Sequence, residues 1–123
     1  MMRRVGIGLV LVGFFTGCGS SSPSAPTTGT GGSAGTAVSI VSGASTRGSG
    51  AYAPNPLTIT SGTTVIWTNN DSTTHTSSSD TPGLFDSGNI AAGGQFSFTF
   101  QAKGTVNYHC NIHPGMIGSI VVQ

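Results

Sequence analysis

Residues 106–122 read VNYHCNIHPGMIGSIVV, and two features of this stretch decide the fold. Apolar and polar residues alternate at its start, and alternation returns at its end. Period-two alternation is typical of a β-strand with one buried face. The seven residues between, 110–116, contain Pro and Gly and form a tight loop. We therefore predict two neighbouring strands at the end of the chain, joined by this loop.

The same alternation occurs in earlier segments of the chain, at residues 38–40, 57–59, 65–68 and 96–100. Turn-forming residues separate these segments, and no helix-period pattern of useful length interrupts them. Short strands at this spacing predict an all-β fold, an antiparallel β-sandwich. Its expected core consists of apolar residues on the inward faces of the strands: Leu57, Ile59, Trp67, Phe96, Phe98 and Phe100.

The composition agrees with strands and turns. The chain has 20 Gly, only 6% charged residues and no Glu, whereas surface helices usually carry Glu, Lys and Arg. Without the N-terminal Arg3 and Arg4, two basic residues oppose three Asp, for a net charge of −1. We expect no nucleic-acid binding, because no basic face remains.

The N-terminus is typical of an export signal. Residues 1–17 begin with two Arg and continue with an apolar run, Val5–Phe15. Eleven residues are too few to span a bilayer, which needs roughly 20, but they fit a signal-peptide core. Small residues then precede Cys18, an arrangement that resembles the bacterial lipobox, in which the cysteine receives a lipid. The alternative is an ordinary signal peptide that leaves Cys18 free.

Three regions follow from this pattern: a lipoprotein signal peptide at 1–17, a lipidated Cys18 with a flexible tether at 18–36, and a folded domain at 37–123. After Cys18 the tether contains only Gly, Ser, Thr, Pro and Ala, too little apolar surface to fold. Its 18 residues would reach about 20–25 Å. We expect an exported, membrane-anchored protein that faces the periplasm or the cell surface.

The candidate chemistry lies in the loop at 110–116. If Cys18 carries lipid, Cys110 has no partner for a disulfide, which is unusual in an exported domain. His113 and Met116 follow Cys110 within seven residues, and His75 lies 35 residues upstream. A loop between two strands could bring His75 to the same end of a sandwich.

Two His, one Cys and a weak axial Met form the ligand set of a type 1 (blue) copper site. The absence of a fourth strong ligand argues against structural zinc. Each residue also has a simpler interpretation: His75 could be a surface loop residue, and Met116 could be core packing. We interpret His109 as a non-ligand, because alternation points it away from Cys110.

Several stretches resemble the cupredoxin family, and specifically its plastocyanin and amicyanin branch. They are NPLTI at 55–59, VIWTNND at 65–71 with His75 beyond it, FDSG at 85–88, and YHCNIHPGMIG at 108–118. The Cys-x-x-His-x-x-Met loop is the short version, similar to amicyanin. The resemblance implies a Greek-key β-sandwich of about eight strands, with one copper ion near its loop end and His113 as the ligand at the solvent edge.

We also expect supporting roles around the copper, of which the resemblance implies the first. The Thr76 backbone amide is expected to donate to the Cys110 sulfur, as the residue after the first His does in relatives. Either Asn69 or Asn111 is expected to tie the two copper loops together. An apolar patch around the His113 edge is expected to dock a partner; its residues are Leu84, Phe85, Ile112 and Pro114.

The leading functional hypothesis is a monomeric one-electron carrier between redox proteins. It would be anchored to a membrane through its N-terminal lipid and would have no enzymatic activity. An alternative with the same ligands is a cell-surface protein that binds or delivers copper. A copper nitrite reductase is a weaker alternative, suggested by the dipeptide His109-Cys110. Those enzymes need further histidines and a second cupredoxin domain, whereas this chain has three His.

Overall fold

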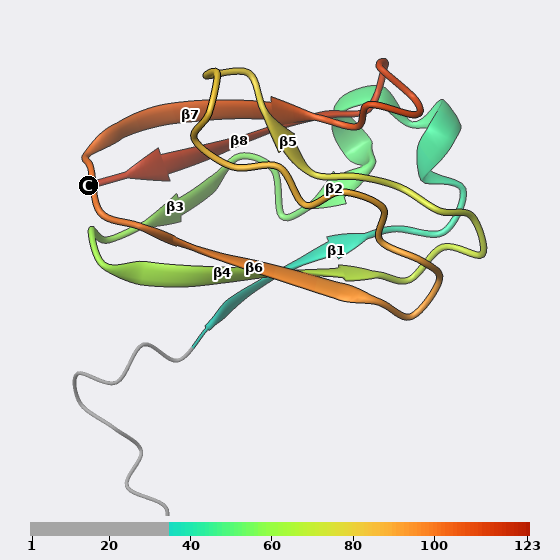
Figure 1. The fold of residues 1–123 in the computed structure, drawn as a ribbon, viewed down its shortest axis with the longest axis horizontal. Coiled ribbons are helices and arrows are strands. Elements are labelled where there is room, and N and C mark those ends of the chain that lie inside the picture. Colours follow the sequence, from blue (N-terminus) through green and yellow to red (C-terminus); the bar gives the residue numbers. More distant parts are fainter. Residues whose placement is uncertain (1–34) are drawn as a thin grey trace, which may run out of the picture.

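Eight strands and two short 3-10 helices form residues 35–123, the part of the chain that this computed structural model describes. One sheet has the order β2 (Tyr52–Ala53), β1 (Thr36–Ile40), β4 (Thr63–Asn69) and β6 (Gln95–Phe100). The other has the order β3 (Leu57–Ile59), β8 (Ile117–Val122), β7 (Gly104–His109) and β5 (Ser78–Ser79). The sheets form two layers (Figure 1), which confirms the predicted all-β sandwich.

The expectation of a purely antiparallel sandwich is wrong, because each sheet contains one parallel pair. β1 runs parallel to β4, and β3 runs parallel to β8. In each sheet the parallel partners are far apart in sequence, and the chain between them passes through the other sheet. Such crossovers allow two strands of one sheet to run in the same direction. The predicted neighbours β7 and β8 are antiparallel, as expected for strands joined by a tight loop.

The core forms where the inward faces of the two sheets meet. Trp67 is fully buried and packs against the aromatic rings of Phe85, Phe96, Phe100 and Tyr108. Of the predicted core, Leu57, Ile59, Trp67 and Phe100 are buried. Phe96 and Phe98 are only partly buried, which corrects the prediction. They lie on β6, an edge strand with a neighbour on one side only, so less of the core covers them.

Period-two analysis did not predict β2 and β5. Each has two residues, too few to show alternation. The predicted tether, 18–36, extends one residue too far, because Thr36 already belongs to β1. The predicted signal peptide, Cys18 and the tether up to residue 34 lie outside the described residues.

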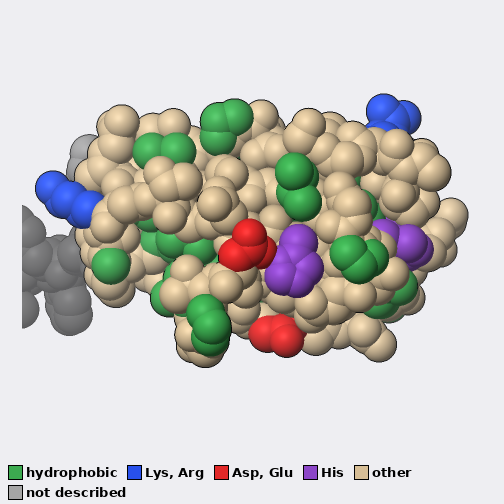
Figure 2. Space-filling model, turned by 90° about the horizontal axis from the view of Figure 1, so that it is seen from above, with side chains coloured by type: hydrophobic (Ala, Val, Ile, Leu, Met, Phe, Trp, Pro, Cys, Tyr) green, Lys and Arg blue, Asp and Glu red, His purple; other side chains and the backbone are tan. Residues whose placement is uncertain are grey.

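The helices η1 (Ala44–Thr46) and η2 (Gly48–Gly50) lie between β1 and β2. They occupy the same end of the sandwich as the loop between β7 and β8, whereas β1 begins toward the opposite end (Figure 1). No helix within residues 35–123 is long and apolar enough to cross a membrane. The face seen in Figure 2 is largely uncharged, and its Lys and Arg side chains lie only at the two ends.

Candidate metal centre

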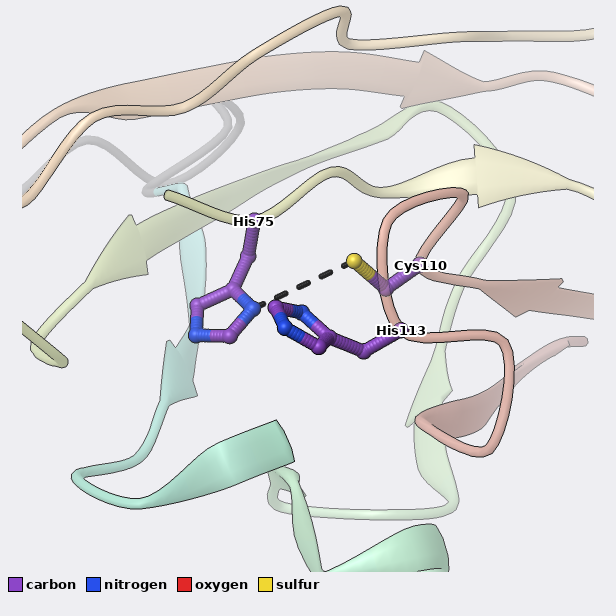
Figure 3. A group of neighbouring side chains, drawn as sticks. All are labelled: His75, Cys110 and His113. Carbon is purple, nitrogen blue, oxygen red and sulfur yellow. Dashed lines mark hydrogen bonds between the residues drawn. The ribbon is translucent and has the colours of Figure 1, made fainter. Parts of the chain in front are cut away.

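Three side chains from two loops converge at the end of the sandwich. His75 lies in the loop between β4 and β5, and Cys110 and His113 lie in the loop between β7 and β8. Their potential ligand atoms all lie within 4.8 Å of one another. Figure 3 shows the two imidazoles and the thiol directed toward a common point. The structure thus brings together residues that are up to 38 positions apart in sequence.

The loop that carries Cys110 and His113 is closed by its own backbone. The Cys110 N–H donates to the carbonyl of Met116 at 3.1 Å, and the Met116 N–H donates to the carbonyl of His113 at 2.9 Å. The side chain of Met116 is fully buried. These two hydrogen bonds hold Cys110, His113 and Met116 together in one tight loop.

The Cys110 thiol is buried and forms no disulfide among the described residues. Its Sγ accepts a hydrogen bond from the Thr76 amide at 3.2 Å, the contact that the resemblance implied. It also lies 3.9 Å from Nδ1 of His75. An N–H donor directed at sulfur stabilises a thiolate, the form that binds metal.

Asp71 orients His75, a role that the sequence analysis missed. Oδ2 of Asp71 lies 2.7 Å from Nε2 of His75. The carboxylate can only accept, so Nε2 carries the proton and Nδ1 keeps a free lone pair. The hydrogen bond with His75, followed by the Gly43 amide, lowers the pKa of Asp71 to about 2. The only sequence clue was a carboxylate within the same loop as the histidine.

His113 provides the observation that best tests whether a metal fits. Its Nδ1 atom is buried, and it has no hydrogen-bond partner among the described residues. Buried polar atoms without a partner are rare and costly in folded proteins. A metal bound between His75, Cys110 and His113 would satisfy this nitrogen. The donors are two imidazoles and one thiolate without a carboxylate, which suits copper.

Asn111, rather than Asn69, ties the two copper loops together. The Asn111 N–H donates to Oγ1 of Thr76 at 2.8 Å, and its side-chain amide donates to Oγ of Ser78 at 2.8 Å. The Asn69 side chain instead donates to the carbonyls of Thr73 and Ile90, so it links the loop of His75 to the segment between β5 and β6. The alternative expectation for Asn69 is therefore wrong.

His109 points away from the three donors, in agreement with strand alternation. Its Nδ1 lies 2.5 Å from the Asp80 carboxylate, and its Nε2 lies 3.0 Å from Oδ1 of Asn111. Both ring nitrogens are thus engaged on the outer face of the sheet. The dipeptide His109-Cys110 provides no second donor to the buried site.

The predicted docking patch needs correction at two of its four residues. Phe85 is only 8% exposed and packs in the aromatic core. Leu84 lines a groove with Phe98 and Val106, and no residue of the loop 110–116 lines that groove. Ile112 is 45% exposed and Pro114 is exposed, both next to His113. Sequence alternation is not defined in loops, so it could not separate the buried Phe85 from the exposed Ile112.

Comparison with protein families identifies the chain. A model of copper binding proteins of the plastocyanin/azurin family matches residues 39–123. The chain belongs to this family. All three converging donors fall within the matched region, so the site is assigned to one copper ion.

Solved structures agree with this membership. A purple cupredoxin from Nitrosopumilus maritimus is 34% identical, with a TM-score of 0.67 over 72% of this chain and 99% of that one. A Cu(I) form of an amicyanin variant is 26% identical, with a TM-score of 0.60 over 72% of this chain and 82% of that one. A search of curated proteins found no match. The cupredoxin resemblance and the predicted fold are therefore confirmed.

Proposed function

We propose that this cupredoxin is a one-electron carrier with a type 1 copper site. His75, Cys110 and His113 would hold the copper ion, and Met116 would be a fourth, weaker donor. The observation that carries the proposal is the buried Nδ1 of His113, which has no hydrogen-bond partner within residues 35–123 and lies near a thiol and a second imidazole. The bound copper would cycle between Cu(I) and Cu(II).

The residues around the site favour rapid electron transfer. Asp71 fixes the ring of His75, Thr76 donates to the sulfur of Cys110, and backbone hydrogen bonds close the loop of His113. Little of this scaffold needs to move when the charge at the centre changes by one unit. A small reorganisation is what an electron carrier needs.

We place the electron port at His113. This residue is partly exposed, unlike the fully buried His75 and Cys110. Exposed apolar side chains flank it on the same loop: Ile112 at 45% and Pro114. An exposed apolar edge of this kind fits transient contact with a redox partner, because it is readily desolvated.

The proposed carrier is a monomer without enzymatic activity. All strong ligand positions come from the protein, which leaves no position for a substrate at the metal.

Copper delivery would use the same ligands but would require copper to leave readily. The rigid, hydrogen-bonded scaffold favours the carrier. Exchange with a Cu(I) chelator tests this: a carrier should lose copper slowly, whereas a delivery protein should lose it within the mixing time.

Copper reconstitution tests the site itself. Cu(II) added to the purified domain should produce an intense blue or purple thiolate charge-transfer band and a type 1 paramagnetic resonance spectrum. Cys110→Ser should abolish the band, and His109→Ala should keep it, because His109 lies on the outer face. A colourless copper-loaded domain would exclude a type 1 centre.

We also propose that a lipid on Cys18 anchors the carrier to a membrane at the cell envelope. The proposal rests on the apolar run Val5–Phe15 and the small residues before Cys18. In cells, Cys18→Ala should move the protein from the membrane to the soluble fraction. Unchanged fractionation would show that another feature holds the protein at the membrane.

A further inference from the structure

Tyr52 reaches the copper site from a strand that carries no ligand. It belongs to β2, at the edge of the first sheet, and its side chain is fully buried. Its hydroxyl donates to the carbonyl oxygen of Thr76 at 2.6 Å. Thr76 leads into β5 of the second sheet, so the Tyr52 phenol connects the two sheets at the copper end.

Thr76 is the residue through which Tyr52 can act on copper. Its N–H donates to Sγ of Cys110 at 3.2 Å, and its Oγ1 accepts the Asn111 N–H at 2.8 Å. With its carbonyl bound to Tyr52, every polar group of Thr76 is engaged. The direction of the Thr76 N–H therefore depends on hydrogen bonds to two other segments of the chain, β2 and the loop that carries Cys110.

The neighbouring segment contacts the copper loops at two further points. The Gly43 N–H donates to Oδ1 of Asp71 at 3.1 Å, and Asp71 binds His75. The Asn55 side chain donates to the carbonyl of Ile117, next to Met116, at 3.1 Å. Residues 43–55 thus bind beside three of the four proposed ligands, and Tyr52 provides the contact nearest to Cys110.

We propose that Tyr52 is a positioning residue for the copper–sulfur bond. By holding the Thr76 carbonyl, its hydroxyl keeps the Thr76 amide directed at the Cys110 sulfur. This N–H withdraws electron density from the thiolate and stabilises the reduced site relative to the oxidised one. The inference rests on the proposed type 1 copper site.

The chain contains a matched control for this hydroxyl. Tyr108 is the other tyrosine, it is equally buried, and its ring centroid lies 4.7 Å from that of Tyr52. Its hydroxyl, however, has no hydrogen-bond partner among the described residues. Tyr52→Phe and Tyr108→Phe therefore remove the same atom from adjacent rings, but only Tyr52→Phe removes a bond to Thr76.

The first experiment uses Cu(I)-loaded, nitrogen-15-labelled protein. In Tyr52→Phe, the Thr76 amide should exchange with solvent deuterium about tenfold faster relative to the amides of β4. The reason is that the buried hydrogen bond that holds the Thr76 carbonyl in place is lost. The reduction potential of the copper should fall, and the thiolate charge-transfer band of the Cu(II) form should shift. Tyr108→Phe should leave the relative exchange of Thr76, the potential and the band unchanged.

A second measurement strengthens the hydroxyl instead of removing it. In the Tyr108→Phe background Tyr52 is the only tyrosine, so uniform 3-fluorotyrosine labels it alone. Fluorine makes the phenol more acidic, so the phenol donates a stronger hydrogen bond to Thr76. The reduction potential should therefore rise, whereas in Tyr52→Phe it should fall. This arm decides the question even if Tyr52→Phe does not fold.

The outcomes separate this inference from the copper assignment. A wild-type domain without a thiolate charge-transfer band overturns the type 1 site itself. A coloured wild-type domain whose potential responds neither to Tyr52→Phe nor to 3-fluorotyrosine overturns only the role of Tyr52. Equal effects of Tyr52→Phe and Tyr108→Phe would also overturn it, since they would reflect general packing.

Discussion

His75 and Asp71 form a buried pair in which the carboxylate fixes the imidazole, with Nε2 and Oδ2 2.7 Å apart. The carboxylate is itself held, because its Oδ1 accepts the N–H groups of Gly43 and Ser72. The ring of His75 therefore has one orientation and one tautomer, with Nδ1 directed toward Cys110. A metal ligand oriented in this way binds more tightly than a freely rotating one.

Asp71→Asn should weaken copper binding by about 10–100-fold and raise the reduction potential. The amide has nearly the same shape, but it is a poorer acceptor for the His75 N–H and lacks the negative charge that favours Cu(II). Chelator competition and voltammetry measure the two effects. Asp80→Asn is the control, because Asp80 contacts His109 on the outer face. Equal affinities for both variants would contradict the role of Asp71.

The sequence could predict the long strands but not the way in which they pair. Alternation located β4, β6, β7 and β8, each with six or seven residues and one inward face, and also the shorter β1 and β3. The two-residue strands β2 and β5 carry no such pattern. The parallel pairing of β1 with β4 depends on how the chain crosses between sheets, which local patterns do not record.

The converging donors were predictable, whereas most of their hydrogen-bond partners were not. Cys110 and His113 stand in one short loop with a distinctive spacing, so the local sequence is sufficient. Asp71 and Tyr52 act through the folded shape: one looks like a turn residue, and the other lies on a strand too short to predict. Backbone amides, such as that of Gly43, leave no trace in residue type.

Gly118→Ala should destabilise the metal-free domain by about 1–3 kcal/mol through overpacking. A Cβ at this position would overlap Cζ of Tyr108, far inside contact distance. Gly115→Ala is the control, because a Cβ there meets nothing within 4 Å. Urea unfolding measures both free energies. Equal losses for the two variants would show that the Tyr108 ring can move aside.

Asp86→Asn should reduce the dependence of stability on acid. The Gly88 N–H, followed by the Ser78 hydroxyl, lowers the pKa of Asp86 below its ordinary 3.8. A lowered pKa stabilises the fold at pH values above 3.8, and this stabilisation is lost as the pH falls through the lower, folded value. The midpoint temperature of thermal unfolding should therefore fall less steeply between about pH 6 and pH 2 in the variant. Parallel curves would contradict this assignment.

Met116→Leu should keep the thiolate band and raise the reduction potential, because it removes a weak axial donor to copper. Leucine has a similar volume, so the buried position beside the site stays filled. Voltammetry and visible spectra of the loaded variant measure the effect. An unchanged potential and spectrum would place Met116 in the core alone.

Ile112→Asp should slow electron self-exchange and leave the reduction potential nearly unchanged. Ile112 is 45% exposed and lies next to His113, so a charge there would have to be desolvated whenever two copper edges meet. Line broadening in mixtures of reduced and oxidised protein measures the exchange rate. Thr58→Asp adds the same charge on β3, at an exposed position outside the copper loops, and should leave the rate nearly unchanged. If both variants slow exchange equally, net charge rather than the His113 edge governs the encounter.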